Sequence, residues 1–111
     1  MKFFPIILLF SLGMNAFAAM ECKGRVQIGQ EITHTALTVT ENTGSKVLYE
    51  GEVSGMHFYA THFPDIGHLF LEIDHNDVIL HTHLFKTVNE LEHTLTAVDR
   101  AVAAELICKI K

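Results

Sequence analysis

The sequence is poor in basic residues. It contains 8 lysines and arginines against 13 aspartates and glutamates in 111 residues. Proteins that hold nucleic acid by its phosphates present clusters of lysine and arginine, and anionic membrane surfaces attract the same residues. We therefore expect neither nucleic acid nor an anionic membrane surface as a partner.

Common catalytic motifs are also missing. Beyond residue 18 the only serines are Ser45 and Ser54, and neither lies in a Gly-x-Ser-x-Gly nucleophile elbow. Neither a phosphate-binding glycine loop nor a His-Glu-x-x-His zinc motif occurs. We predict a protein that is not an enzyme, with no catalytic residue and no organic cofactor.

Only one stretch of the chain is long and apolar, and it lies at the N-terminus. Lys2 precedes the apolar residues 3–12, and Ala16-Phe17-Ala18 places small residues at the −3 and −1 positions of a cleavage site. This run is too short to span a bilayer and has the length of a secretory signal. We predict that residues 1–18 are a cleavable signal peptide, that residues 19–111 form one domain without membrane insertion, and that the protein is periplasmic or secreted.

The predicted mature chain is small and acidic. Residues 1–18 hold one lysine and no acidic residue, so 93 residues remain with seven basic and thirteen acidic side chains, a formal charge of −6. This length provides one modest hydrophobic core.

There are only two cysteines, Cys22 and Cys108, at opposite ends of the mature chain. They lack the Cys-x-x-Cys spacing of a redox site, and an even pair in an oxidising compartment is usually a disulfide. We predict a Cys22–Cys108 disulfide, which requires the first and last strands to be neighbours.

Short alternating, β-branched runs separated by turn residues dominate the rest of the chain. Residues 86–99 are ambiguous between a short helix and a loop followed by a strand, and we favour the second. The pattern predicts an all-β fold, a small antiparallel β-sandwich or small open barrel of about 7–8 short strands with its ends joined by one disulfide. The expected strands cover residues 22–28, 32–40, 46–53, 57–63, 68–73, 78–85 and 101–111.

Histidine is abundant, with eight residues in the chain and six of them between residues 57 and 83. If all eight took up protons, the mature charge would change from −6 to about +2 near the ordinary histidine pKa of about 6.5. On a strand reading of residues 57–63, His62 falls on the core side, opposite to His57, Tyr59 and Thr61.

The histidines at 81 and 83 are two residues apart and would share one face of a strand. With residues 74–77 as the turn and Ile73 opposite Val78, His83 would face His68. Neighbouring imidazoles are a common start of a zinc or copper site, whereas solvated surface histidines are the plainer alternative. The predicted metal ligands are His68, His81 and His83.

Three functions remain open. The leading one is a non-enzymatic binding or structural module whose partner is an unknown protein or small ligand. The alternatives are a zinc- or copper-binding periplasmic protein that uses the histidine cluster, and a secreted hydrolase inhibitor.

Overall fold

A computed structural model of the chain describes residues 20–87 and 91–110. The predicted signal peptide, residues 1–18, lies outside the described residues, as do residues 88–90. The described residues form nine strands: β1 (Met20–Ile28), β2 (Glu31–Ala36), β3 (Thr38–Asn42), β4 (Val47–Val53), β5 (Met56–Phe63), β6 (His68–His75), β7 (Val78–Lys86), β8 (Glu92–Asp99) and β9 (Val102–Ile110).

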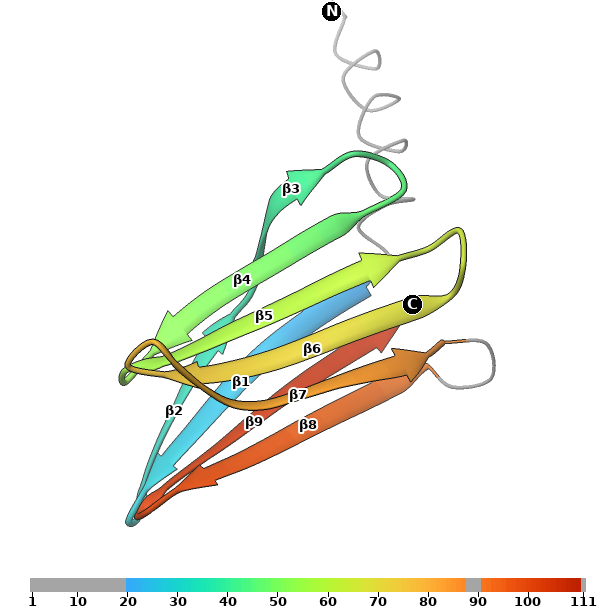
Figure 1. Cartoon of the computed structure of the whole chain (residues 1–111). Coiled ribbons are helices and arrows are strands. Elements are labelled where there is room, and N and C mark those ends of the chain that lie inside the picture. The colour runs from blue at the N-terminus through green and yellow to red at the C-terminus, as the bar shows by residue number, and fades with distance from the viewer. Residues whose placement is uncertain (1–19, 88–90, 111) are drawn as a thin grey trace, which may run out of the picture.

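The strands form two antiparallel sheets, one with the order β2-β1-β9-β8 and one with the order β3-β4-β5-β6-β7. Because β1 pairs with β9, the up-and-down chain returns to its starting point (Figure 1). The predicted all-β sandwich is confirmed. The strand number exceeds the prediction because residues 31–42 are divided between the two sheets. The strand that we favoured within residues 86–99 is confirmed as β8.

The division of residues 31–42 occurs at Leu37, where the chain passes from one sheet to the other. The Leu37 side chain is buried, and its N–H donates to the Cys22 carbonyl oxygen at 3.0 Å. A Cβ atom on Gly51 would lie 3.1 Å from this leucine. Close packing of Leu37 against β1 and β4 therefore bends what the sequence presents as one strand.

The core follows the alternation of the strands. One set of alternate residues in each central strand is buried, and the two sheets approach so closely that Phe58 lies directly over Gly24. A Cβ atom at Gly24 would come within 2.5 Å of the Phe58 ring, so a larger side chain would displace it. The largest fully buried side chains are Phe58, Met56, Leu69, Leu71, Ile73, Leu106, Val26 and Val47.

The β6–β7 hairpin turns over two residues, Asn76 and Asp77, which have φ values of 51° and 68°. Positive φ at both central positions is the requirement of a type I′ turn, which asparagine and aspartate tolerate. His75 is therefore paired with Val78. The predicted turn over residues 74–77, with Ile73 opposite Val78, is wrong.

A β-bulge follows this turn. The register shifts between Asp74, which pairs with Ile79, and Ile73, which pairs with His81, so Leu80 is the extra residue of β7. A single extra residue exchanges the two faces of a strand beyond the bulge. Leu80 packs against the core, so burial of this side chain favours the bulge.

Cys22 and Cys108 are directly opposite each other on β1 and β9, and the predicted disulfide between them is confirmed. Their Cα atoms are 4.1 Å apart and 86 positions separate them in sequence. Such a bond indicates an oxidising, non-cytoplasmic environment. Within residues 20–87 and 91–110, no helix is long and apolar enough to span a membrane.

Replacing both cysteines, in Cys22→Ala/Cys108→Ala, should lower the free energy of unfolding by about 4–5 kcal/mol, because the closed loop spans nearly the whole domain. Urea denaturation of the variant and of the oxidised wild type measures this loss. Reduced wild-type protein should unfold at the same urea concentration as the variant. A loss below about 1 kcal/mol would show that the chain ends are held by the β1–β9 pairing alone.

Candidate functional site

The outer face of the four-stranded sheet is an ordinary solvated surface. Along β1, β8 and β9 it carries cations and carboxylates in equal number, and no phenylalanine or tyrosine lies on its strands. Alternation between an apolar inner side and a polar outer side is typical of antiparallel sheets. The charged residues are Lys23, Arg25 and Lys109 against Glu21, Glu92 and Glu105.

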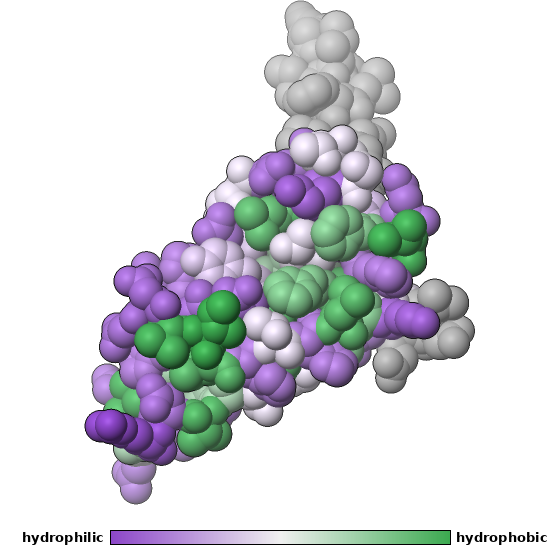
Figure 2. All heavy atoms as spheres, viewed as in Figure 1, coloured by the Kyte–Doolittle hydropathy of each residue, from purple (hydrophilic) through white to green (hydrophobic). Residues whose placement is uncertain are grey.

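The outer face of the five-stranded sheet differs in both charge and aromatic content. Three of the six phenylalanines and tyrosines in the described part of the chain point outward here, and apolar groups reach the surface over this sheet (Figure 2). We call this surface the acidic face. Its members used below are Leu48, Glu50, Glu52, His57, Tyr59, Phe63, Phe70, Glu72, Asp74, Thr82 and Leu84.

Tyr59 lies at the centre of the acidic face, with Glu50 of β4 and Glu72 of β6 directly opposite on its two neighbouring strands. The His57 ring stacks on the Tyr59 ring, with centroids 4.4 Å apart and planes 6° from parallel. Burial and the carboxylates of Asp74, Glu50 and Glu72 raise the pKa of Tyr59. Tyr59 therefore keeps its hydroxyl proton, and its uncharged aromatic ring is surrounded by carboxyl groups.

The carboxylate of Glu50 is held in position from two sides. Thr40 Oγ1 donates to Glu50 Oε2 at 2.8 Å, and His57 Nε2 lies 3.5 Å from Glu50 Oε1. Because its side chain is ordered by these neighbours, Glu50 would lose little conformational entropy on meeting a ligand.

The carboxyl groups of Glu72 and Asp74 lie on the same side of β6, two residues apart. Burial, the hydrogen bond with Asp74 and the negative charge of Asp74 raise the pKa of Glu72 to about 7, against an opposing effect of His57. Asp74 Oδ1 is buried and has no hydrogen-bond partner among the described residues. Two crowded carboxyl groups of this kind would be relieved by a cation.

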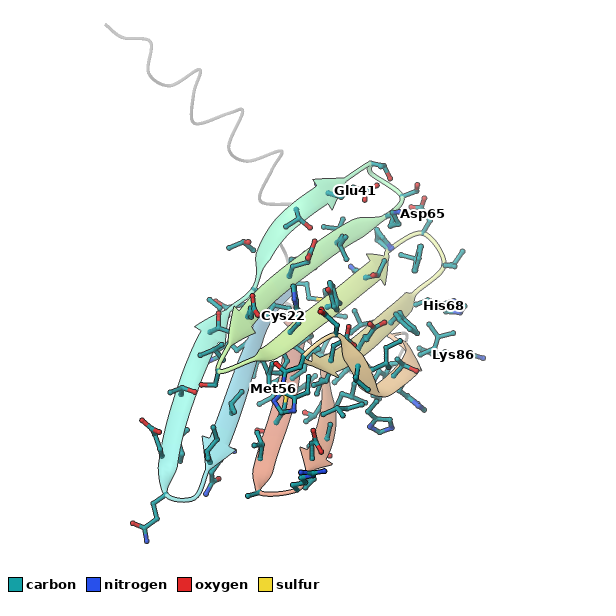
Figure 3. The ribbon with its side chains drawn as sticks, turned by 60° about the vertical axis from the view of Figure 1, so that its left-hand side comes forward. Cys22, Glu41, Met56, Asp65, His68 and Lys86 are labelled. Atoms are coloured by element: carbon teal, nitrogen blue, oxygen red, sulfur yellow. A yellow bond between two sulfur atoms is a disulfide. The ribbon has the colours of Figure 1, made fainter. Side chains whose placement is uncertain are left out.

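A shallow hollow of about 470 Å³ adjoins one end of the acidic face. It lies between the β3–β4 hairpin and the β5–β6 turn, and Glu41 and Asp65, both labelled in Figure 3, are among its lining residues. Its floor is formed by Phe63 and Ile66, and the ion pair Lys46 Nζ–Glu41 Oε2, 3.4 Å long, lies at its edge.

The structure does not bring the three predicted metal ligands together. His68 pairs with Lys86 at the end of the acidic face, where Figure 3 shows both residues. His81 and His83 pair with Ile73 and Leu71, which point into the core, so they lie on the opposite side of the sheet from His68. The predicted register, and the three-imidazole patch built on it, are wrong because the bulge at Leu80 exchanges the faces.

His81 and His83 have other contacts. His81 Nδ1 donates to the Thr96 carbonyl oxygen at 2.9 Å and so joins β7 to β8 across the gap between the sheets. The His83 ring meets Phe85 edge-on at 4.5 Å. Across the part of the chain that the structure describes, no three histidine, cysteine, aspartate or glutamate side chains are placed to hold a metal ion.

A second pair of histidines lies between the sheets. His62 is on the core side of β5, as predicted, and His93 of β8 is 3% exposed and contacts Phe85 at 5.1 Å between ring centroids. Burial lowers the pKa of His62, and the charge of nearby His93 lowers it further. Taking up a proton here therefore opposes folding.

The alternation of β5 predicted His57 and Tyr59 on an outer face, but it did not predict that Glu50, Glu72 and Asp74 surround them. The available signal was the outward set of β6, which carries an aromatic and two acidic residues at alternating positions. The partners of these residues on β4 and β5 depend on strand pairing, which the pattern alone does not specify.

Comparison with known proteins gave no match to a family model, to a curated protein or to a solved structure. The role of the acidic face is therefore inferred from its residues and their geometry.

Substituting Glu72→Gln should raise the melting temperature at pH 8 and leave it nearly unchanged at pH 4.5. A raised carboxyl pKa contributes stability below the unfolded-state value of about 4.3, and this stability is lost as the pH rises through about 7. Thermal unfolding followed by circular dichroism measures both conditions, with Thr82→Gln as a control on the same face. An equal effect of Glu72→Gln at both pH values would contradict the raised pKa.

Replacing His62 should make the protein less sensitive to acid. A lowered histidine pKa contributes stability that is present above the unfolded-state value of about 6.5 and is lost as the pH falls through the lower folded-state value. Both His62→Gln and His62→Phe should therefore flatten the fall in melting temperature between pH 7.5 and pH 5. If neither variant changes this slope, His62 does not resist protonation in the folded protein.

Proposed function

We propose that the protein is an exported, non-enzymatic binding module that holds a partner protein against its acidic face. Export is supported by the signal-like residues 1–18 and by the disulfide. The non-enzymatic part rests on the sequence, which contains none of the common catalytic motifs considered above.

The observation that carries this proposal is the contrast between the two outer faces of the same sandwich. Both belong to antiparallel sheets of similar size, so sheet architecture alone predicts two polar, balanced surfaces. Within the described strands, the acidic face alone carries outward phenylalanine and tyrosine rings, Tyr59, Phe63 and Phe70, and an excess of carboxylates. Aromatic side chains are enriched where proteins meet partners.

An apolar row crosses four strands of the acidic face and is interrupted by one threonine of this face, Thr61 of β5. Leu48, Thr61, Phe70 and Leu84 are cross-strand neighbours on β4, β5, β6 and β7, and Leu84 is 49% exposed. A row of this kind offers a partner apolar contact area, whereas the flanking carboxylates restrict which partner fits.

Site-specific photocrosslinking in the cells that produce the protein tests this proposal. A photoreactive phenylalanine analogue at Thr82, an exposed residue of the acidic face on β7, should give a discrete crosslinked product. The same analogue at Thr94, an equally exposed threonine of β8 on the outer face of the other sheet, should give none.

The additional substitution Phe70→Ser should remove the Thr82 product, because it removes an aromatic ring from the middle of the apolar row. Equal products from Thr82 and Thr94, or a Thr82 product that survives Phe70→Ser, would place binding elsewhere on the molecule.

A further inference from the structure

We propose that the partner presents a basic protein surface, with arginine or lysine side chains that enter the acidic face between Glu50 and Glu72, over the ring of Tyr59. This inference rests on the proposed docking role of the acidic face and names the chemistry of what docks there.

The first support is the charge of this sheet. Five carboxylates point outward from its strands: Glu41, which forms an ion pair with Lys46 at one end, and Glu50, Glu52, Glu72 and Asp74. Within the described strands of the sheet, Lys86 is the one lysine or arginine, and it lies at the end of the face beside His68 (Figure 3). The centre of the face therefore has negative charge without a cation on the strands around it.

The second support is the arrangement around Tyr59. Glu50 and Glu72 lie on the two strands that flank this tyrosine, so their backbones are about 10 Å apart. A guanidinium placed over the ring face that His57 leaves uncovered would have a carboxylate on either side, and it would gain a cation–π contact with the tyrosine. An aromatic ring between acidic residues suits a cation better than it suits a neutral group.

The third support is the condition of the Glu72–Asp74 pair. Asp74 Oδ1 is buried without a hydrogen-bond partner among residues 20–87 and 91–110, and burial together with the neighbouring Asp74 carboxyl group raises the pKa of Glu72. A buried polar atom without a partner costs free energy. A cation beside this pair would favour the ionised form of both carboxyl groups.

Other occupants fit less well. A second copy of the chain presents either the same acidic face or the balanced face of the four-stranded sheet, and neither offers clustered cations among the described residues. Nucleic acids and anionic lipids carry the same sign of charge as the acidic face, so both would be repelled.

The test uses a blocked peptide in which arginine alternates with leucine, because alternation puts all the arginines on one side of an extended chain. Its affinity is measured by calorimetry for the wild-type protein and two double variants of equal charge change. Glu50→Gln/Glu72→Gln neutralises the acidic face, and Glu92→Gln/Glu105→Gln neutralises two carboxylates of the other outer face.

We expect the acidic-face variant to bind about tenfold more weakly than wild type, and the control variant to change by less than about twofold. Equal weakening by both variants would show general charge attraction and would overturn the inference, as would absence of binding by the wild type. Melting curves confirm that both variants are folded.

The number of protons released on binding provides a second readout. Non-specific charge attraction would not make this release depend on one residue. Docking of a cation should ionise Glu72, so calorimetry at pH 7 in two buffers of different ionisation enthalpy should show release of a proton fraction that Glu72→Gln reduces. The other titratable groups facing this site are Glu50, His57, Tyr59, Asp74 and Asp77. Undiminished release in Glu72→Gln would overturn the assignment of the cation to this pair.

The two proposals can fail separately. If the Thr82 crosslink to the cellular partner survives Glu50→Gln/Glu72→Gln, the acidic face docks a partner by its apolar row, and the inference of a basic partner falls. Self-association that this double variant abolishes, measured by analytical ultracentrifugation, would assign the face to a second copy and would also overturn the inference.

Discussion

The pairing of β1 with β9, locked by the Cys22–Cys108 disulfide, is the constraint on which the rest of the structure depends. An up-and-down chain of nine strands has two free ends, and only the pairing of its first and last strands returns it to a closed arrangement. The disulfide makes this pairing covalent at a buried position between the sheets. It thereby fixes the β1–β9 register within the four-stranded sheet, in which Gly24 of β1 lies under Phe58 of the other sheet.

The bulge at Leu80 is the second feature that determines the arrangement of side chains in the fold. A strand of nine residues must pair with β6 on one side and lie against β8 on the other, and one extra residue lets it bend toward β8. The bulge turns His81 and His83 toward the inner side of the sheet, where His81 reaches the Thr96 carbonyl oxygen. It also leaves Leu84 pointing outward, so the apolar row of the acidic face extends onto the edge strand.

The two outer faces of the sandwich differ in how completely their charged groups are paired. The four-stranded sheet contains the disulfide, the buried His93 and a balanced outer surface. The five-stranded sheet tolerates a crowded pair, Glu72 and Asp74, and a buried carboxylate oxygen without a partner among the described residues. Groups that cost stability when they are unpaired tend to gather where a ligand completes their interactions, which agrees with the proposed docking role of this face.

The sequence by itself determined most of the strands, the inner and outer residues of β5, β6 and β9, and the disulfide, because alternation is local and two cysteines allow only one pairing. It placed His62 in the core and assigned the last strand correctly. The tertiary structure alone decided that His68 is separated from His81, that His62 lies near enough to His93 to be affected by its charge, and that Glu50 and Glu72 flank Tyr59. These outcomes depend on register, which a two-residue turn and one bulged residue set through packing between strands.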